Sequence, residues 1–156
     1  MLQELFITNF VLIDKVTINL CDRLNVFSGA TGVGKSMVIG ALNFILGGRA
    51  TADIVRSGKD EATVIGKFSL KDKNLLRQIT KVADNITIDE ELLLQRTIDT
   101  NGRSRCRLND MPITVSLLKE LGELSVNIHG QHEHETLLHG TNQLHILDDF
   151  GGRSPL

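Results

Sequence analysis

A glycine-rich stretch, GATGVGKS at residues 29–36, has the spacing of a loop that binds phosphate groups. Gly29, four further residues and then Gly34-Lys35-Ser36 match the pattern G-x-x-x-x-G-K-[ST]. Glycines allow backbone angles that a side chain forbids, so successive N–H groups can point at one anion. In this pattern the lysine reaches the outer phosphates and the hydroxyl ligates Mg²⁺. We therefore expect a nucleoside triphosphate to bind at Gly29, Ala30, Thr31, Gly32, Val33, Gly34, Lys35 and Ser36.

A glycine turn that only happens to precede a lysine is the alternative for this stretch. The context disfavours it, because an apolar strand is expected at 24–28 and a helix at 36–46. A strand before the loop and a helix after it are what the motif requires. The start of that helix would add free N–H groups and the positive end of its dipole.

A second polar cluster, HGQHEH at residues 129–134, contains Gln131. An uncharged amide at the end of a strand can hold Mg²⁺ and a water beside the γ-phosphate without adding charge. The histidines at 129, 132, 134 and 139 also raise the alternative of a zinc site. Their spacing lacks the helical H-E-x-x-H order, so polar loop residues near a nucleotide are favoured over metal ligands.

The carboxylate that a hydrolase needs is not evident in the sequence. Enzymes with this loop place a second carboxylate at the end of an apolar strand to hold Mg²⁺. Asp148 is the one candidate, but its surroundings favour a helix. The D-F-G triplet at 149–151 lacks the other kinase motifs, and no N-K-x-D segment for guanine is present. Whether the chain is an enzyme stays open at this point.

Three arginines, Arg103, Arg105 and Arg107, are spaced by two residues. On a strand this spacing places all three guanidinium groups on one face. Such a stripe can contact the phosphate backbone of DNA. The alternative is a solvated face or the charged edge of a sheet, where charge prevents further strand pairing, and this second interpretation is slightly favoured.

The bulk composition indicates one soluble, cytoplasmic domain. The chain has 156 residues, is 41% hydrophobic and carries a formal net charge of −2, so any contact with nucleic acid must be local. Cys21 and Cys106 lack metal-ligand spacing and are expected to be buried, reduced thiols. The first ten residues lack the basic region of a signal peptide, and no apolar run is long enough to span a membrane.

Apolar periodicity predicts an α/β fold with a mixed sheet in which early antiparallel strands flank the strand at 24–28. Asn101-Gly102 suits a tight hairpin turn, Gly47-Gly48 a helix stop, and Thr114 a helix cap. The expected strands are 2–10, 11–20, 24–28, 61–70, 92–99, 104–109 and 124–128, and the expected helices are 36–46, 72–82, 114–122 and 141–150.

Taken together, several stretches resemble the N-terminal part of the RecN family of bacterial DNA repair proteins, which is related to SMC proteins and ABC-type ATPases. The stretches are ITNFVLID, LNVFSGATGVGKS, ALNFILGGRA, NGRSRCRLNDMPIT, LKELGELSVNIHGQHEHETLL and QLHILDDF. They cover nearly the whole chain, and HGQHEH combined with the phosphate loop is more specific than the loop alone.

The resemblance implies a P-loop ATPase head of the ABC/SMC type, of which this chain is the N-terminal half, with an antiparallel hairpin subdomain. Residues 1–150 would form the N-terminal lobe, with ATP on loop 29–36, and 151–156 a tail that starts a coiled coil. Gln131 would be the catalytic Q-loop residue, sharing Mg²⁺ with Ser36. The implied partners are ATP, DNA, the C-terminal half of the head and a second head as a homodimer, and the implied location is the nucleoid.

Two departures from the family pattern matter. Residue 30 is Ala where the family usually has Glu, which leaves a backbone cradle intact. The signature motif, the Mg²⁺-binding aspartate, its neighbouring glutamate and the switch histidine are expected beyond Leu156. The leading expectation is thus a half-head that binds ATP weakly, hydrolyses essentially none alone and serves recombinational repair of double-strand breaks. The alternatives are a stand-alone nucleotide-responsive module that binds DNA or protein and, less favoured, a small phosphotransferase.

Overall fold

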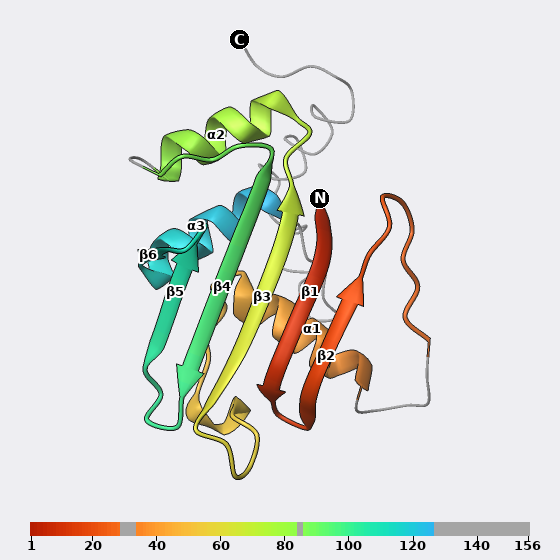
Figure 1. Cartoon of the computed structure of the whole chain (residues 1–156), viewed down its shortest axis with the longest axis vertical. Helices are drawn as coiled ribbons and strands as arrows, with labels where there is room; N and C mark the ends of the chain where they lie inside the picture. Colours follow the sequence, from red (N-terminus) through yellow and green to blue (C-terminus); the bar gives the residue numbers. More distant parts are fainter. Residues whose placement is uncertain (29–33, 84–85, 127–156) are drawn as a thin grey trace, which may run out of the picture. The chain divides into compact units, whose positions relative to one another are not determined.

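The computed structural model describes residues 1–28, 34–83 and 86–126 of the chain. Residues 1–126 form one compact unit built on a six-stranded sheet in the order β2-β1-β3-β4-β5-β6 (Figure 1). The strands are β1 (Leu2–Phe10), β2 (Ile13–Asn19), β3 (Glu61–Ser69), β4 (Glu91–Asp99), β5 (Ser104–Leu108) and β6 (Met111–Ile113). The helices are α1 (Gly34–Ile45), α2 (Lys73–Ala83) and α3 (Val115–Ser125), with a 3-10 turn η1 at Ala52–Ile54.

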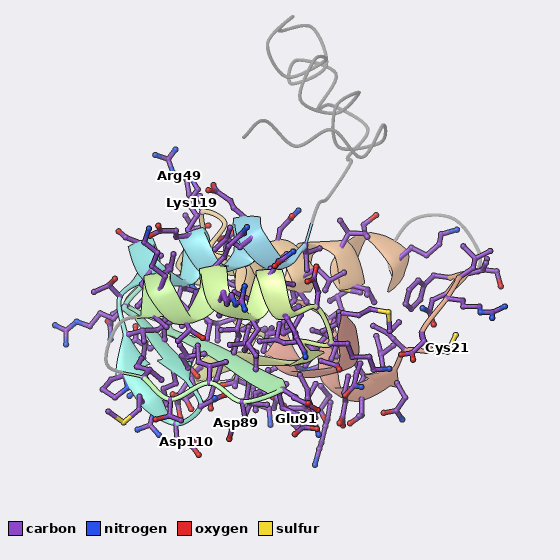
Figure 2. The ribbon with its side chains drawn as sticks, turned by 90° about the horizontal axis from the view of Figure 1, so that it is seen from above. Cys21, Arg49, Asp89, Glu91, Asp110 and Lys119 are labelled. Atoms are coloured by element: carbon purple, nitrogen blue, oxygen red, sulfur yellow. The ribbon has the colours of Figure 1, made fainter. Side chains whose placement is uncertain are left out.

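The three α-helices lie on one side of the sheet (Figure 2). The strands facing them alternate buried and partly exposed residues, as a sheet covered on one face requires. The core on the helix-covered face includes Leu5, Ile7, Val64, Phe68, Leu92, Leu94, Ile98 and Leu108. The other face, which we call the open face, carries mostly polar side chains, among them Thr63 and Thr97, whose hydroxyl oxygens are 2.9 Å apart. The α/β fold class is therefore confirmed.

Both hairpins at the β5 end of the sheet follow from local turn chemistry. At the predicted Asn101-Gly102 turn, Gly102 has φ +78°, and the Asp99 carboxylate accepts the N–H groups of Asn101 and Arg103. β5 then turns into β6 through Asn109 and Asp110, both at positive φ. Two such residues form a two-residue hairpin turn. Strand β6 was not expected, because three residues are too few to show a period.

The segment 24–28 corrects one expectation, because it forms no strand. Leu24 and Val26 are 82% and 76% exposed. The segment is apolar, as expected, but it pairs with no strand among the described residues. A strand needs a hydrogen-bonding neighbour, and β2 ends the sheet on that side. The expected mixed sheet accordingly contains only antiparallel neighbour pairs in the described ranges.

The strand expected at 124–128 is wrong for its first three residues, because Leu124 and Ser125 belong to α3 and Val126 is its C-cap. Gly122 was taken as the end of that helix, yet it is a buried helical residue. Its role is close packing rather than termination, as described below for its contact with Leu46. Residues 127 and 128 and the helix expected at 141–150 lie outside the described ranges.

The remaining expected elements agree with the structure to within a few residues at their ends. Thr114 caps α3 as expected, since its side-chain oxygen accepts the N–H of Leu117 at 3.1 Å. In the described part of the chain, no helix is long and apolar enough to cross a membrane.

Candidate nucleotide-binding site

The last three residues of the predicted phosphate loop, Gly34, Lys35 and Ser36, form the exposed first turn of α1. That turn contains no acidic residue. The first N–H groups of a helix have no partner within it, and the dipole makes this end positive. An anion is favoured at such a position, where the Lys35 ammonium adds a full positive charge.

The space beside Gly34 is open, because a Cβ there would meet no described atom within 4 Å. The exposed Ser36 hydroxyl is an oxygen donor of the kind that Mg²⁺ accepts. The described end of the loop thus fits a phosphate with its cation. Residues 29–33, Gln131, the histidines at 129–139 and Asp148 lie outside the described ranges, so their approach to Lys35 stays a prediction.

Helix α1 is fixed to the sheet through its second half. Ala41, Phe44 and Ile45 are buried, and the rings of Phe44 and Phe10 lie 5.8 Å apart between centroids. Gly40 lies beside the same ring, and a Cβ there would make an ordinary contact with Phe10 at 3.7 Å. Ile39 of the same helix is 48% exposed, so apolar side chains of α1 are not all covered by the sheet. The packing therefore holds the far end of α1, leaving its first turn accessible.

Arg96 of β4 binds the C-terminal end of α1. Its side chain is buried, and one terminal nitrogen, Nη1, donates to the backbone oxygens of Phe44 at 2.8 Å and Gly48 at 2.7 Å. The other, Nη2, donates to Ser104 Oγ at 3.3 Å. The guanidinium carbon lies 4.4 Å from the centre of the Phe44 ring, within cation–π range. A cation at this end offsets the negative pole of the helix dipole.

Burial carries an electrostatic cost at this position. It lowers the pKa of the Arg96 guanidinium, while the neighbouring Cys106 thiol group raises that pKa in part. Burial also raises the pKa of Cys106, which favours the protonated thiol, although Arg96 lowers it in part. Cys21 was expected to be buried as well, but it is exposed. The Nε atom of Arg96 has no hydrogen-bond partner. Arg96 is thus held as a cation by carbonyl oxygens and a ring face. None of the ion pairs between described residues includes Arg96.

The end of α1 also touches α3 through two glycines. Gly47 stands at φ +86°, and a Cβ there would lie 2.5 Å from Cα of Lys119. A Cβ on Gly122 would lie 2.7 Å from the backbone oxygen of Leu46. Both distances are shorter than real Cβ contacts, so the two segments approach closely only because neither residue has a side chain. The helix that begins at the phosphate loop is thereby fixed by β1, β4 and α3 together.

The three arginines proposed as a stripe are all exposed, but only Arg105 and Arg107 lie on strand β5. Arg103 belongs to the preceding turn. Arg105 forms an ion pair with Glu61. The strand register places Lys15, Lys67, Arg105 and Arg107 on the open face together with Glu4, Glu61, Glu91 and Asp99. The stripe is therefore part of a solvated face of mixed charge. The edge-strand interpretation is wrong, because β5 pairs with both β4 and β6.

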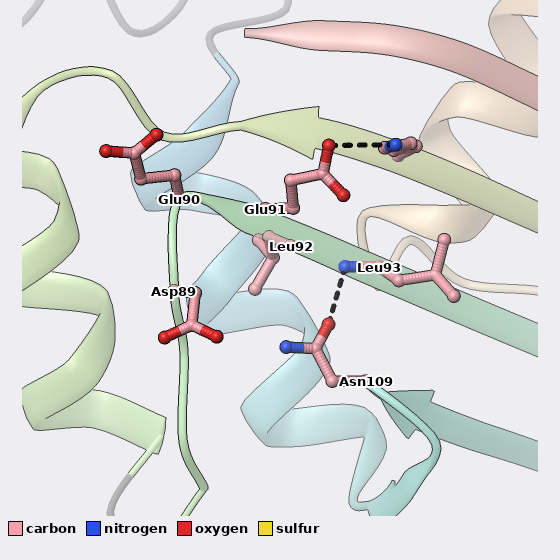
Figure 3. A pocket seen from close by; sticks show the side chains of 7 residues that line it. Asp89, Glu90, Glu91, Leu92, Leu93 and Asn109 are labelled. Atoms are coloured by element: carbon pink, nitrogen blue, oxygen red, sulfur yellow. Dashed lines mark hydrogen bonds and ion pairs between the residues drawn. The ribbon is translucent and has the colours of Figure 1, made fainter.

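A shallow hollow of about 740 Å³ lies where β4 begins (Figure 3). Asp89, Glu90 and Glu91 line it, and their carboxylates come from a loop and the first residue of β4. Glu91 is already bound to Lys67, with 2.9 Å between nitrogen and oxygen. In the described ranges no group of three or more His, Cys, Asp or Glu side chains is arranged to hold a metal ion.

The residue that sequence reasoning missed is Arg96. Its signal was present, because Leu92, Leu94, Arg96 and Ile98 occupy the alternate positions of β4 that face the core. A single charged residue at a position where the alternation predicts a buried apolar residue indicates a cation whose hydrogen-bond partners lie inside the protein.

Comparison with known proteins places the chain in a family. Residues 4–146 match the family model described as an AAA domain. Over 97% of its length the chain is 40% identical to the DNA repair protein RecN of Halalkalibacterium halodurans, of which it covers 27%. It is 39% identical over its whole length to RecN of Vibrio cholerae, of which it covers 28%. The chain thus spans about a quarter of the length of these relatives.

Solved structures agree on the fold. An Smc head domain from Pyrococcus furiosus, bound to a domain of ScpA, aligns with a TM-score of 0.73 over 97% of this chain and 42% of that one, at 20% identity. A chain from a study of ATP-driven dimerization and DNA-stimulated activation of SMC ATPases aligns with a TM-score of 0.69, at 21% identity, over 96% of this chain and 98% of that one. The expected fold of the SMC head type is therefore confirmed.

Proposed function

The chain belongs to the family of AAA domains, and from that membership we propose that it binds ATP together with Mg²⁺ through residues 29–36. The observation that carries this proposal is the open first turn of α1, with Lys35 and Ser36 at a helix start that holds no acidic side chain. Lys35 would neutralise the outer phosphates, and Ser36 would ligate the cation.

Within the same proposal, Gln131 approaches the bound cation from the segment 129–134 and positions a water beside the terminal phosphate. The amide oxygen would complete the coordination begun by Ser36 without adding a negative charge near the phosphates. The Mg²⁺ would neutralise charge on the transferring phosphoryl group, as in other enzymes of this loop type. The role of these residues is to bind and orient the nucleotide.

For the protein as a whole, we propose a part in the recombinational repair of DNA breaks, because relatives at up to 40% identity are named DNA repair protein RecN. We propose that hydrolysis requires a further part of the polypeptide and the pairing of two heads around ATP. ATP-driven dimerization is described for SMC ATPases of the same fold. The exposed apolar residues Leu24 and Val26 support an additional partner, since an exposed apolar segment gains by packing or pairing with one. The same relatives disfavour a stand-alone binding module.

Replacing Lys35 by alanine is expected to weaken ATP binding roughly ten- to hundredfold. A hydrogen bond to a charged group contributes about 1.5–3 kcal/mol, and this lysine would supply one such bond to phosphate. Isothermal titration of the 156-residue chain with Mg²⁺-ATP measures the change directly. Lys15→Ala is the matched control, because it removes the same charge from the open face of the sheet, and its affinity should equal that of the wild type.

Equal affinities of the Lys35→Ala variant and the wild type would overturn the assignment of the loop. The proposal would fail also if the wild type showed no saturable binding at millimolar ATP. Phosphate release is expected to stay at background in the chain alone. A turnover that disappears in Lys35→Ala would instead contradict the requirement for a further part of the polypeptide.

A further inference from the structure

Helix α2 carries three cations at a spacing of four residues: Lys73, Arg77 and Lys81. Side chains four apart lie on the same face of a helix. With a rise of 1.5 Å per residue, the three positions are spaced about 6 Å apart along the axis and span about 12 Å. All three residues are exposed. We call this set the α2 ridge.

The charge of the α2 ridge is not neutralised within the described structure. The helix, KNLLRQITKVA, contains no acidic residue. The ion pairs of the described residues involve Arg56, Lys67, Lys71, Arg105 and Lys119, and none of the three ridge cations. Asp72 accepts the backbone N–H of Asn74 at 2.8 Å, at the start of the helix. Like charges four residues apart weaken a helix, so this arrangement is unfavourable for α2 by itself.

The opposite side of α2 fixes the helix to the unit. Ile79 and Ala83 are buried, Leu75 and Leu76 are partly buried, and the helix packs against α3. The ridge is thus presented on a packed element rather than on a loose segment. Because the backbone is already ordered, contact with a partner would cost only the freedom of three side chains.

We propose that the α2 ridge binds the sugar–phosphate backbone of DNA. The spacing of about 6 Å suits this partner, since one strand of a duplex advances 3.4 Å per phosphate and successive cations would meet alternate phosphates. The choice of DNA among polyanions rests on the proposed function; the ridge itself does not. Contacts to phosphates position a protein on DNA without reading its sequence.

The α2 ridge is a better polyanion site than the arginines of β5. Arg105 is paired with Glu61, and acidic side chains alternate with the cations over the open face. With a net charge of −2, the chain as a whole does not attract a polyanion, so a local cluster of cations must supply the contact with phosphate groups. The ridge is such a cluster, with a single sign of charge along a whole helix face.

The test measures binding of a fluorescent random-sequence DNA duplex to the full chain, without nucleotide, across a salt series. The variant is Lys73→Gln, Arg77→Gln and Lys81→Gln combined, and the matched control is Arg103→Gln, Arg105→Gln and Arg107→Gln combined. Loss of three phosphate contacts should reduce the slope of log affinity against log salt by about 2.7. Between 50 and 200 mM salt, the ratio of wild-type to variant affinity should therefore fall by about 40-fold. The control should keep the wild-type slope.

A second variant guards against loss of fold. Lys73→Arg combined with Lys81→Arg keeps every charge and should keep the wild-type slope. The proposal is overturned if the glutamine variant retains the wild-type slope, if the β5 control loses as much as the α2 variant, or if the wild type does not bind at low salt. Tighter binding of an RNA than of the duplex would overturn the choice of DNA. None of these outcomes depends on Lys35, so they are distinct from a failure of ATP binding.

Discussion

Replacing Arg96 by methionine is expected to lower the free energy of unfolding by about 2–4 kcal/mol. Methionine fills a similar volume but cannot donate hydrogen bonds to the backbone oxygens of Phe44 and Gly48. The Gly48 oxygen would be left without a partner, which costs about 1–3 kcal/mol, whereas the Phe44 oxygen also accepts the N–H of Gly47 at 3.2 Å and would lose one hydrogen bond worth about 0.5–1.5 kcal/mol. Part of this loss is offset, because Arg96 Nε already lacks a partner and burying the guanidinium is itself unfavourable. Urea unfolding followed by circular dichroism measures the difference.

Arg107→Met is the matched control for that experiment. Arg107 lies on the neighbouring strand, is exposed and faces away from the helices, so its replacement should change the free energy of unfolding by less than about 0.5 kcal/mol. A stability of Arg96→Met equal to that of the control would show that the guanidinium contributes nothing net at the end of α1. The cation would then be tolerated there rather than required.

Replacing Gly47 by alanine is expected to cost about 2–5 kcal/mol. A left-handed backbone costs a residue with a side chain about 1–2 kcal/mol, and overpacking a tight contact adds about 1–3 kcal/mol. Both terms apply at Gly47, which stands at φ +86° with its Cβ direction blocked by the backbone of Lys119. Thermal and urea unfolding of the variant provide the measurement.

Gly58→Ala separates the two terms. Gly58 has a similar φ of +78°, but a Cβ there would meet nothing within 4 Å. It should therefore show only the backbone cost of about 1–2 kcal/mol. If Gly47→Ala and Gly58→Ala lost the same stability, the close contact between the end of α1 and α3 would carry no energetic weight.

The elements that could be predicted from the sequence are those whose signals are local. The alternation of Ala62, Val64 and Phe68 identifies β3, because a half-covered strand buries every second residue. Thr114 marks the start of α3 by its own hydrogen bond to the helix. The loop pattern likewise predicts a helix start at Lys35 and Ser36, where α1 begins.

The misinterpreted elements depend on distant partners. The apolar residues at 24–28 have strand character, but pairing is a property of the neighbour as much as of the segment. Glycine is the residue type typical of a helix end, which is why Gly122 was taken as one. Only the close approach of Leu46 shows why a glycine is needed there. For the same reason the hydrogen bonds of Arg96 could not be foreseen, since their acceptors lie about fifty residues away in the chain.

The strand order has a consequence for the segment that carries the phosphate loop. Neighbouring strands in the sheet are also consecutive in the chain, with the exception of β1 and β3. Between these two strands the chain forms β2 and then a long connection to Glu61. The entropy of closing such a connection grows only with the logarithm of its length, by about 0.6 kcal/mol for each doubling. An insertion between β2 and the phosphate loop would therefore cost the sheet little stability, so the length of this connection can vary while the strands that hold α1 stay paired.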